Sequence, residues 1–241
     1  MSSNQSRRAI VTGASRGIGL AIAQAIVADG GSVMMTGRDP ARLDQAVREL
    51  QRAAGDAGRV CGAAVDVRDL PAVRKLVADA ARQFDGLDTL INNAGVGAFV
   101  EVASMSDDDW ARVIDTNLTG VFYCTRAAIP EMKKSGGGWI INIASLAGRN
   151  YFPGGAAYCA SKAGLVAFSE SLMQEVRFDN IRVSVVMPGS VATEFSGPMA
   201  DKDSSWKLSP DDVAEAVMDL LRHPGRSLPS KVEIRPSRPV K

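Results

Sequence analysis

The segment Arg8-Ala-Ile-Val-Thr-Gly-Ala-Ser-Arg-Gly-Ile-Gly-Leu-Ala-Ile-Ala-Gln-Ala-Ile-Val27 contains three consecutive structural signals. Arg8–Val11 is short and apolar like a buried strand, Thr12–Gly19 is rich in glycine, and Leu20–Val27 has the apolar pattern of a helix. Such a turn can cradle dinucleotide phosphates, because backbone N–H groups approach closely and the helix N-terminus adds partial positive charge. The spacing Gly13-x-x-x-Gly17-x-Gly19 differs from the commoner G-x-G-x-x-G, and a simple glycine turn is the alternative interpretation of this segment alone.

Strand and helix patterns alternate along the rest of the chain. Strands are predicted at 32–36, 59–65, 88–91, 139–143, 183–186 and 231–235, and helices at 40–54, 69–84, 117–134, 157–177 and 209–221, with one more headed by a capping box at 106–109. This alternation predicts an α/β fold with a doubly wound parallel sheet (Rossmann fold), three-layer α/β/α, in a single domain over 1–241. Ligands of such folds gather at the carboxyl ends of the strands.

Composition narrows the class of protein. The chain has 241 residues, of which 46% are hydrophobic, enough for one substantial core. Its 28 basic and 27 acidic residues give a net charge of +1, so we expect neither nucleic acid nor a membrane surface as partner. No apolar run reaches the roughly 20 residues that span a bilayer, and the polar start Met1–Arg8 does not resemble a signal peptide, so a cytoplasmic location is expected.

Cysteine and histidine usage gives no metal signal. Cys61, Cys124 and Cys159 are odd in number and lack the spacing of metal ligands, so reduced thiols are predicted. His223 is the only histidine and lies in the turn-like sequence His-Pro-Gly, so no histidine-rich metal site is expected.

Tyr158 and Lys162 form a Tyr-x-x-x-Lys pair. Residues four apart lie on the same face of a helix, and a nearby cation favours the phenolate. The pair could therefore lower the tyrosine pKa from its usual value of about 10 towards neutral pH. A group of that acidity suits proton transfer between carbonyls and alcohols. On its own the pair is weak evidence, because Tyr and Lys at this spacing are common on solvated helix faces.

Several ordered motifs strengthen this interpretation. They are the Thr12–Gly19 loop, Asn92-Asn-Ala-Gly95, Asn117, Ser145, the pair Tyr158 and Lys162, and Pro188-Gly189 followed by Thr193. In this order the motifs closely resemble the short-chain dehydrogenase/reductase family in its single-domain form of about 250 residues. The resemblance covers nearly the whole chain.

The resemblance implies roles for four catalytic residues. Tyr158 would be the general acid in carbonyl reduction and the general base in alcohol oxidation. Ser145 would hydrogen-bond the same substrate oxygen. Lys162 would lower the tyrosine pKa and reach the hydroxyls of the nicotinamide ribose. Asn117 would hold a water through a backbone rearrangement and link the lysine to bulk proton supply.

The resemblance also implies a cofactor-binding set. Asp66 would accept a hydrogen bond from the adenine amino group, and Val67 would make a backbone contact beside it. The set comprises Gly13, Ser15, Arg16, Gly17, Ile18, Gly19, Arg38, Asp66, Val67, Asn93, Ala94, Gly95, Tyr158, Lys162, Pro188, Gly189, Val191 and Thr193. Asn93, Ala94 and Gly95 would line the adenine ribose, and the last four residues would lie at the carboxamide side of the nicotinamide, although a plain Pro-Gly turn also explains them.

Charge favours the phosphorylated cofactor. The second strand ends at Thr36-Gly37-Arg38 without an acidic residue, whereas a free ribose 2′-hydroxyl is usually bound by a carboxylate there. Arg16 in the glycine loop adds a second guanidinium, and two guanidiniums can bind a phosphate through charge-assisted bonds. Asp39 could reach the ribose, but its place before Pro40 favours helix capping. We therefore predict that NADP(H) is preferred over NAD(H).

Two other classes of function are alternatives to this interpretation. Gly13-Ala-Ser15-Arg-Gly17 also fits the G-x-S-x-G nucleophile elbow of hydrolases. Against hydrolysis, the motif follows the first strand, the only candidate base is His223, and the other motifs are left unexplained. A non-catalytic dinucleotide-binding sensor or partner module is the second alternative, opposed by the intact catalytic set.

The substrate is less well specified than the chemistry. Many bacterial relatives are 3-oxoacyl-acyl carrier protein reductases, but these end in a Val-Asp-Gly-Gly-like segment that Val232–Lys241 lacks. This departure favours a general ketone or aldehyde reductase. A substrate loop is expected at about 192–208, where Phe195, Met199 and Trp206 could line an apolar pocket or simply pack. The family resemblance also implies a homodimer or homotetramer, formed through the helices that carry Asn117 and Tyr158.

Overall fold

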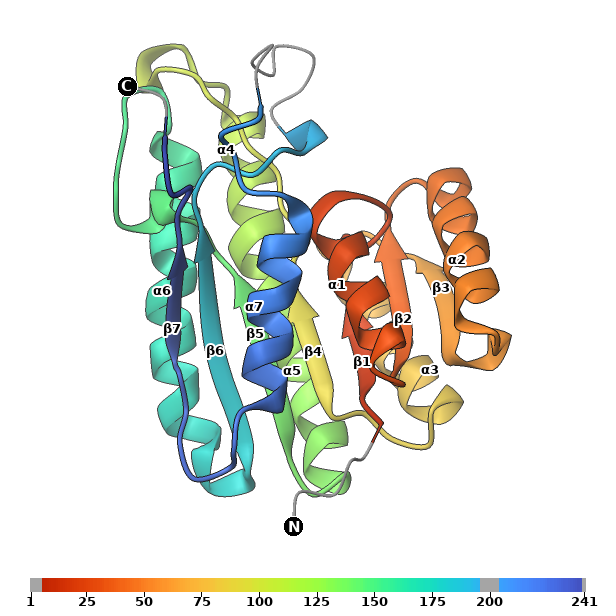
Figure 1. Ribbon diagram of the computed structural model, residues 1–241. Helices are drawn as coiled ribbons and strands as arrows, with labels where there is room; N and C mark the ends of the chain where they lie inside the picture. The colour runs from red at the N-terminus through yellow and green to blue at the C-terminus, as the bar shows by residue number, and fades with distance from the viewer. Residues whose placement is uncertain (1–5, 196–203, 240–241) are drawn as a thin grey trace.

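The computed structural model describes residues 6–195 and 204–239, and its centre is a parallel sheet of seven strands (Figure 1). The strands are β1 (Arg8–Val11), β2 (Ser32–Gly37), β3 (Val60–Ala64), β4 (Thr89–Asn92), β5 (Gly138–Ile143), β6 (Ile181–Pro188) and β7 (Lys231–Ile234). Their order is β3-β2-β1-β4-β5-β6-β7. The chain winds outward from β1 in one direction and then from β4 in the other, which confirms the predicted doubly wound sheet.

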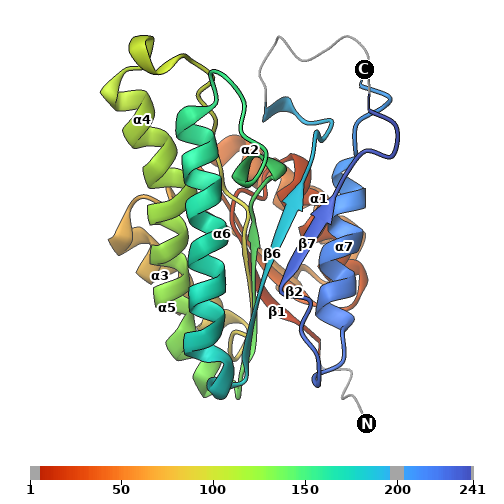
Figure 2. The same cartoon turned by 90° about the vertical axis from the view of Figure 1, so that its left-hand side faces the viewer.

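Helices cover both faces of the sheet. On one face lie α1 (Gly17–Ala28), α2 (Pro40–Ala54) and α7 (Pro210–Arg222). On the other lie α3 (Leu70–Gln83), α4 (Asp107–Ile114), α5 (Gly120–Lys134) and α6 (Ala156–Val176). Figure 2, which views the sheet nearly edge-on, shows α3 to α6 on one side and α1 and α7 on the other. The three layers confirm the predicted α/β/α arrangement.

The apolar strands supply side chains to two separate cores. In β1, Ala9 and Val11 pack towards α1, whereas Ile10 packs towards α3 and α5. In β5, Ile141 belongs to the same core as α1, whereas Ile140 belongs to the core that contains α3 and α5. Successive side chains of a strand point to opposite faces, so a strand covered on both sides must be apolar throughout. This explains why the strands appear in the sequence as continuous apolar runs.

Side-chain caps fix where several helices begin. The Asp39 carboxylate accepts from the Arg42 backbone N–H at 3.2 Å, with Pro40 as the first helical residue, so the predicted capping role of Asp39 is confirmed. Ser209 and Asp212 form the reciprocal bonds of a capping box at the start of α7. The box predicted at 106–109 is only partly correct, because there the acidic partner accepts from the serine hydroxyl.

One predicted helix boundary is wrong. A helix was expected to begin at Asn117, but α4 runs through a π-helical turn, Asp115–Thr119, directly into α5. The helix does not stop at this point, because the residues that flank the turn keep helical backbone angles and the turn is only wider than in an α-helix. Among the described residues, no helix is long and apolar enough to cross a membrane.

Candidate active site

A cleft of about 1840 Å³ opens at the carboxyl ends of the strands. It runs along the glycine loop and the ends of β2 to β6. All the predicted catalytic and cofactor-binding residues line it except Gly19 and Asn117. The sheet topology explains the convergence, because the loops after β1 and β4 diverge at the point where the winding reverses.

The glycine loop leaves the start of α1 uncapped. Arg16 is the N-cap residue, but its side chain makes no capping hydrogen bond, and the first turn of α1 contains no acidic residue. The first N–H groups of this helix are thus available to an anionic ligand. Gly13 has a φ of +65°, and a Cβ there would lie 2.9 Å from Ala94 Cα. The loop therefore approaches the chain after β4 too closely for a side chain at Gly13.

Gly19 and Asn93 have a packing role that the sequence did not reveal. A Cβ on Gly19 would lie 2.4 Å from the Asn93 side-chain nitrogen, which explains why Gly19 is absent from the cleft wall. That nitrogen donates to the carbonyls of Thr12 and Gly13 at 2.9 and 3.1 Å. The Asn93 side chain thus holds the glycine loop against the end of β4, and Asn93 also lines the cleft.

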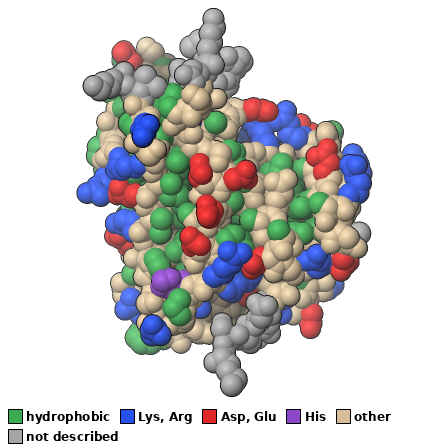
Figure 3. All heavy atoms as spheres, in the orientation of Figure 1, with side chains coloured by type: hydrophobic (Ala, Val, Ile, Leu, Met, Phe, Trp, Pro, Cys, Tyr) green, Lys and Arg blue, Asp and Glu red, His purple; other side chains and the backbone are tan. Residues whose placement is uncertain are grey.

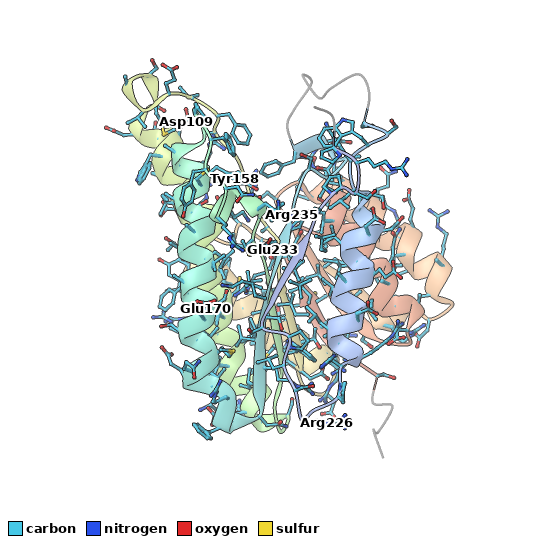
Figure 4. The ribbon with its side chains drawn as sticks, turned by 60° about the vertical axis from the view of Figure 1, so that its left-hand side comes forward. Asp109, Tyr158, Glu170, Arg226, Glu233 and Arg235 are labelled. Atoms are coloured by element: carbon cyan, nitrogen blue, oxygen red, sulfur yellow. The ribbon has the colours of Figure 1, made fainter. Side chains whose placement is uncertain are left out.

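Tyr158, Lys162 and Ser145 come together at the other end of the cleft. Tyr158 lies near the N-terminal end of α6 (Figure 4), and Lys162 follows one turn later. The buried Lys162 Nζ donates to the Ile143 carbonyl at 2.9 Å and lies 5.8 Å from the centroid of the Tyr158 ring. The Ser145 hydroxyl accepts from the Ala147 N–H at 3.1 Å. The strand end of β5 and helix α6 thus supply all three groups.

Burial, rather than the lysine charge, sets the acidity of the tyrosine. Burial raises the pKa of Tyr158 above its ordinary value, and the hydrogen bond with Ser145 opposes this rise. Burial also lowers the pKa of Lys162 to about 8. The expectation that Lys162 draws the tyrosine pKa towards neutral pH is therefore wrong for the protein alone. Desolvation disfavours the charged form of both side chains, and the ammonium is hydrogen-bonded to the Ile143 carbonyl.

Asn117 lies behind the cleft and connects two of its walls. Its side-chain oxygen accepts from the Val96 N–H at 2.8 Å, and its nitrogen donates to the Val96 carbonyl at 2.9 Å and to Ser161 Oγ at 3.0 Å. The side chain is fully buried and clamps the loop after β4 to α6. The predicted role in holding a water through the backbone is not tested by these contacts and stays a prediction.

Asp66 is already paired at the opposite end of the cleft. Arg68 binds both of its carboxylate oxygens, with distances from 2.7 to 3.1 Å, and these bonds hold the pKa of Asp66 below its usual range. The predicted hydrogen bond from an adenine amino group would share this carboxylate with Arg68. Arg68 is not among the residues predicted for the site, although a cation two residues after the aspartate was a usable signal.

Arg16, one of the two predicted phosphate-binding arginines, is paired with an acidic side chain in the protein alone. Its guanidinium pairs with Glu194, and the same carboxylate oxygen accepts from Arg42 Nη1 at 3.0 Å. These two arginines hold the pKa of Glu194 below its usual range. Arg38 lines the same part of the cleft. Figure 3 shows basic and acidic side chains side by side at the upper rim of the molecule.

Tyr158 is part of an aromatic wall of the cleft. We use this name for Phe99, Phe152, Tyr158 and Phe195, with ring centroids 5.6 Å apart for Phe99–Tyr158, 5.7 Å for Tyr158–Phe195 and 6.1 Å for Phe99–Phe152. The three phenylalanines are 40 to 49% exposed and line the cleft, which makes an apolar surface beside the phenol. Phe99 and Phe152 were missed in the sequence because nothing local marks them.

The remaining sequence candidates fall outside this cluster or outside the described residues. Trp206 lines the cleft, whereas Met199 lies outside the described residues. His223 ends α7, where its ring hydrogen-bonds Ser227, and it appears as the purple patch low on the surface in Figure 3. It does not line the cleft and so cannot serve Ser15 as a base. Residues 6–195 and 204–239 hold no cluster of three potential metal ligands.

A comparison with protein families matches residues 7–204 to the short chain dehydrogenase model. Among curated relatives, the chain is 36% identical over 225 residues to a 3-oxoacyl-[acyl-carrier-protein] reductase of Haemophilus influenzae, covering 90% of each chain. It is 38% identical over 231 residues to nodulation protein G of a Rhizobium species, covering 95% of this chain and 86% of the relative.

Solved structures agree with these relatives. A metagenomic short-chain oxidoreductase in complex with NADP superposes with a TM-score of 0.84 at 36% identity, covering 98% of this chain and all of the other. An alcohol dehydrogenase from the archaeon Thermococcus sibiricus, in complex with 5-hydroxy-NADP, gives a TM-score of 0.88 at 30% identity, covering 97% of this chain and 98% of the other.

Proposed function

The chain belongs to the short-chain dehydrogenase family of oxidoreductases, and we propose that it uses NADP(H) to interconvert carbonyl and alcohol groups, mainly as a ketone or aldehyde reductase. One observation carries the proposal. A single cleft contains the uncapped glycine loop and three arginines at one end, and Ser145, Tyr158 and Lys162 at the other.

The residues at both ends of the cleft fit a nicotinamide dinucleotide. The uncapped start of α1 suits its phosphates, and the guanidiniums of Arg16 and Arg38 suit a 2′-phosphate. The Lys162 ammonium has one acceptor among the described residues, so its other N–H groups can bind ribose hydroxyls. When bound, the nicotinamide ring would supply or accept a hydride at the substrate carbon.

The protein itself would supply the proton. A phenol with a raised pKa carries its proton at neutral pH, so Tyr158 can donate it to a carbonyl oxygen as that oxygen gains charge. The Ser145 hydroxyl accepts from the Ala147 N–H, and its contact with the Pro188 carbonyl is a long one of 3.5 Å. That proton can therefore turn to the same substrate oxygen. Lys162, with a pKa of about 8, is mostly cationic at pH 7 and favours negative charge nearby.

The aromatic wall supports a choice of substrate. Phe99, Phe152 and Phe195 leave an apolar, partly exposed surface around the phenol that transfers the proton. Such a surface favours a carbonyl compound that carries an apolar or aromatic substituent. Reduction of 3-oxoacyl thioesters is the alternative within the family, and it is kept because a relative at 36% identity carries that name.

A broad activity scan tests this function. The purified chain is mixed with NADPH or NADH and a panel of aryl ketones, aliphatic aldehydes, quinones and acetoacetyl thioesters, and the loss of reduced nicotinamide absorbance is followed. We expect turnover with NADPH, highest for carbonyls with an apolar substituent. A preference for thioesters would establish the 3-oxoacyl alternative instead.

The same scan separates the enzyme from a dinucleotide-binding sensor. A sensor would bind NADPH in calorimetry and turn over no member of the panel. Because a sensor does not require proton transfer, the presence of Ser145, Tyr158 and Lys162 in one cleft favours the enzyme.

A further inference from the structure

Glu194 lies between two arginines that line the cleft with it. Arg16 comes from the glycine loop, Arg42 from the first turn of α2, and Glu194 from the segment after β6. One oxygen of the carboxylate, Oε2, accepts from both guanidiniums. Arg42 and Glu194 are separated by 152 residues in sequence, so the fold alone brings them together. All three residues line the cleft, as does Arg38.

Two guanidiniums that share one anionic oxygen form a site for an anion. A carboxylate and a phosphomonoester present the same kind of acceptor to such a pair, but the phosphomonoester carries more charge and more acceptor oxygens. We infer that Glu194 occupies this anion site as an internal competitor, and that the phosphomonoester on the adenine ribose of the dinucleotide displaces Glu194 from Arg16 and Arg42. The inference rests on the proposed use of a phosphorylated dinucleotide.

The energetics of the pair allow displacement. The side chains of Arg16, Arg42 and Glu194 are 51, 46 and 68% exposed, so solvent screens both ion pairs. Exposed pairs of this kind contribute little stability, and a dianionic group outcompetes a carboxylate for the same guanidiniums. Glu194 would therefore weaken binding of the phosphorylated nucleotide moderately, without preventing it.

A rival role for Glu194 makes the opposite prediction. If its carboxylate instead bound the free hydroxyls of an adenine ribose, as carboxylates do for the unphosphorylated cofactor, then removing its charge would weaken binding of an unphosphorylated nucleotide. A purely structural ion pair would change neither affinity. The three roles thus differ in the sign of the effect and in the nucleotide affected.

Calorimetry with two nucleotide fragments distinguishes these roles without any turnover. The probes are adenosine 2′,5′-bisphosphate, which carries the extra phosphate, and adenosine 5′-monophosphate, which lacks it. Glu194→Gln should tighten the bisphosphate by about three- to tenfold, with the monophosphate within about twofold. Arg42→Gln should weaken the bisphosphate by about tenfold or more and leave the monophosphate unchanged.

Matched controls and a double variant sharpen the test. Glu49→Gln and Arg48→Gln change exposed residues of α2 that lie outside the cleft, and both should leave the two affinities unchanged. In the double variant Glu194→Gln/Arg42→Gln, most of the gain in bisphosphate affinity from Glu194→Gln should disappear. Glu194 competes with the phosphate for Arg42, so its removal has little effect when Arg42 is absent.

Three results would overturn the inference. They are an unchanged or weakened bisphosphate affinity in Glu194→Gln, equal losses for both nucleotides in Arg42→Gln, and a wild-type protein that binds neither nucleotide. The last result would also remove the proposed cofactor. The expected binding pattern without any carbonyl turnover would defeat the proposed reaction and leave this inference standing.

Discussion

The two ends of the cleft use charge in opposite ways. At the Tyr158 end, a buried lysine and a partly buried phenol have pKa values set by loss of water. At the Arg16 end, the charges are exposed and pair with one another. Removing a buried charge or its partner changes stability strongly, whereas solvent screens an exposed ion pair, so that another ion can replace one of its members. We therefore expect large effects on chemistry and stability at the first end and graded effects on affinity at the second.

Tyr158→Phe should have the largest effect. It removes the phenol that is the proposed proton donor and keeps the ring in the aromatic wall. General acid catalysis contributes about 10²- to 10⁴-fold, so kcat for NADPH-dependent carbonyl reduction should fall by that amount. NADPH affinity, measured by calorimetry, should change little. A variant with nearly wild-type kcat would place the proton donor elsewhere.

Lys162→Met should remove a pH-dependent part of the stability. The lysine pKa is about 8 in the folded protein, against 10.5 for the free side chain. Between these pH values the unfolded chain binds more protons, so the free energy of unfolding should rise with pH. Denaturant titrations at pH 8 and 10.5 should show wild type gaining about 3 kcal/mol more than the methionine variant over this window. Equal pH dependence in both proteins would mean that the lysine is well solvated.

Asn117→Ala should be more destabilising than loss of the exposed pair. It leaves buried hydrogen-bonding groups of Val96 and Ser161 without their partner, at a cost of about 1–3 kcal/mol each for a group left unsatisfied. Glu194→Gln should change the free energy of unfolding much less, because solvent screens its two ion pairs. Urea denaturation of both variants measures the difference, and similar values for the two would contradict the contrast drawn between the ends.

Arg38→Ala should shift cofactor preference at the exposed end. Removing one guanidinium from the proposed phosphate-binding end should weaken NADPH by about tenfold and leave NADH nearly unchanged. Apparent affinities for the two cofactors provide the measurement. An NADH preference in the unmutated protein would defeat the predicted preference altogether.

Phe152→Ala should have the smallest effect. Phe152 contacts Phe99 but lies one ring further from Tyr158, so it contributes mainly to the apolar surface. We expect KM for aryl ketones to rise by about three- to tenfold, with KM for short aliphatic aldehydes little changed. An equal rise for both substrates would argue against aromatic contact with the substrate.

Local signals account for most of what the sequence predicted. The glycine loop, the Asp39 cap and the apolar strands depend on neighbouring residues, so the order of elements and the doubly wound sheet could be predicted. The convergence of Ser145 and Tyr158 on one cleft follows from that topology together with the ordered motifs.

Features that depend on distant contacts could not be predicted in this way. The pairing of Arg42 with Glu194 and the contact of Phe99 with Tyr158 join segments that are far apart in the chain. The pKa direction of Tyr158 depends on how much water the whole fold excludes, which the spacing to Lys162 does not encode. The continuity of α4 and α5 through Asn117 was not predicted, because no local residue pattern marks the π-helical turn that joins them.

Isotope transfer tests the central claim most directly. An aryl ketone that the protein reduces is incubated with wild type or Tyr158→Phe and with NADPH carrying deuterium at the transferable position of its ring, and the alcohol is analysed by mass spectrometry. The account predicts one deuterium on the former carbonyl carbon with wild type and almost no alcohol with the variant. Unlabelled alcohol from wild type, or labelled alcohol formed equally fast by the variant, would contradict it.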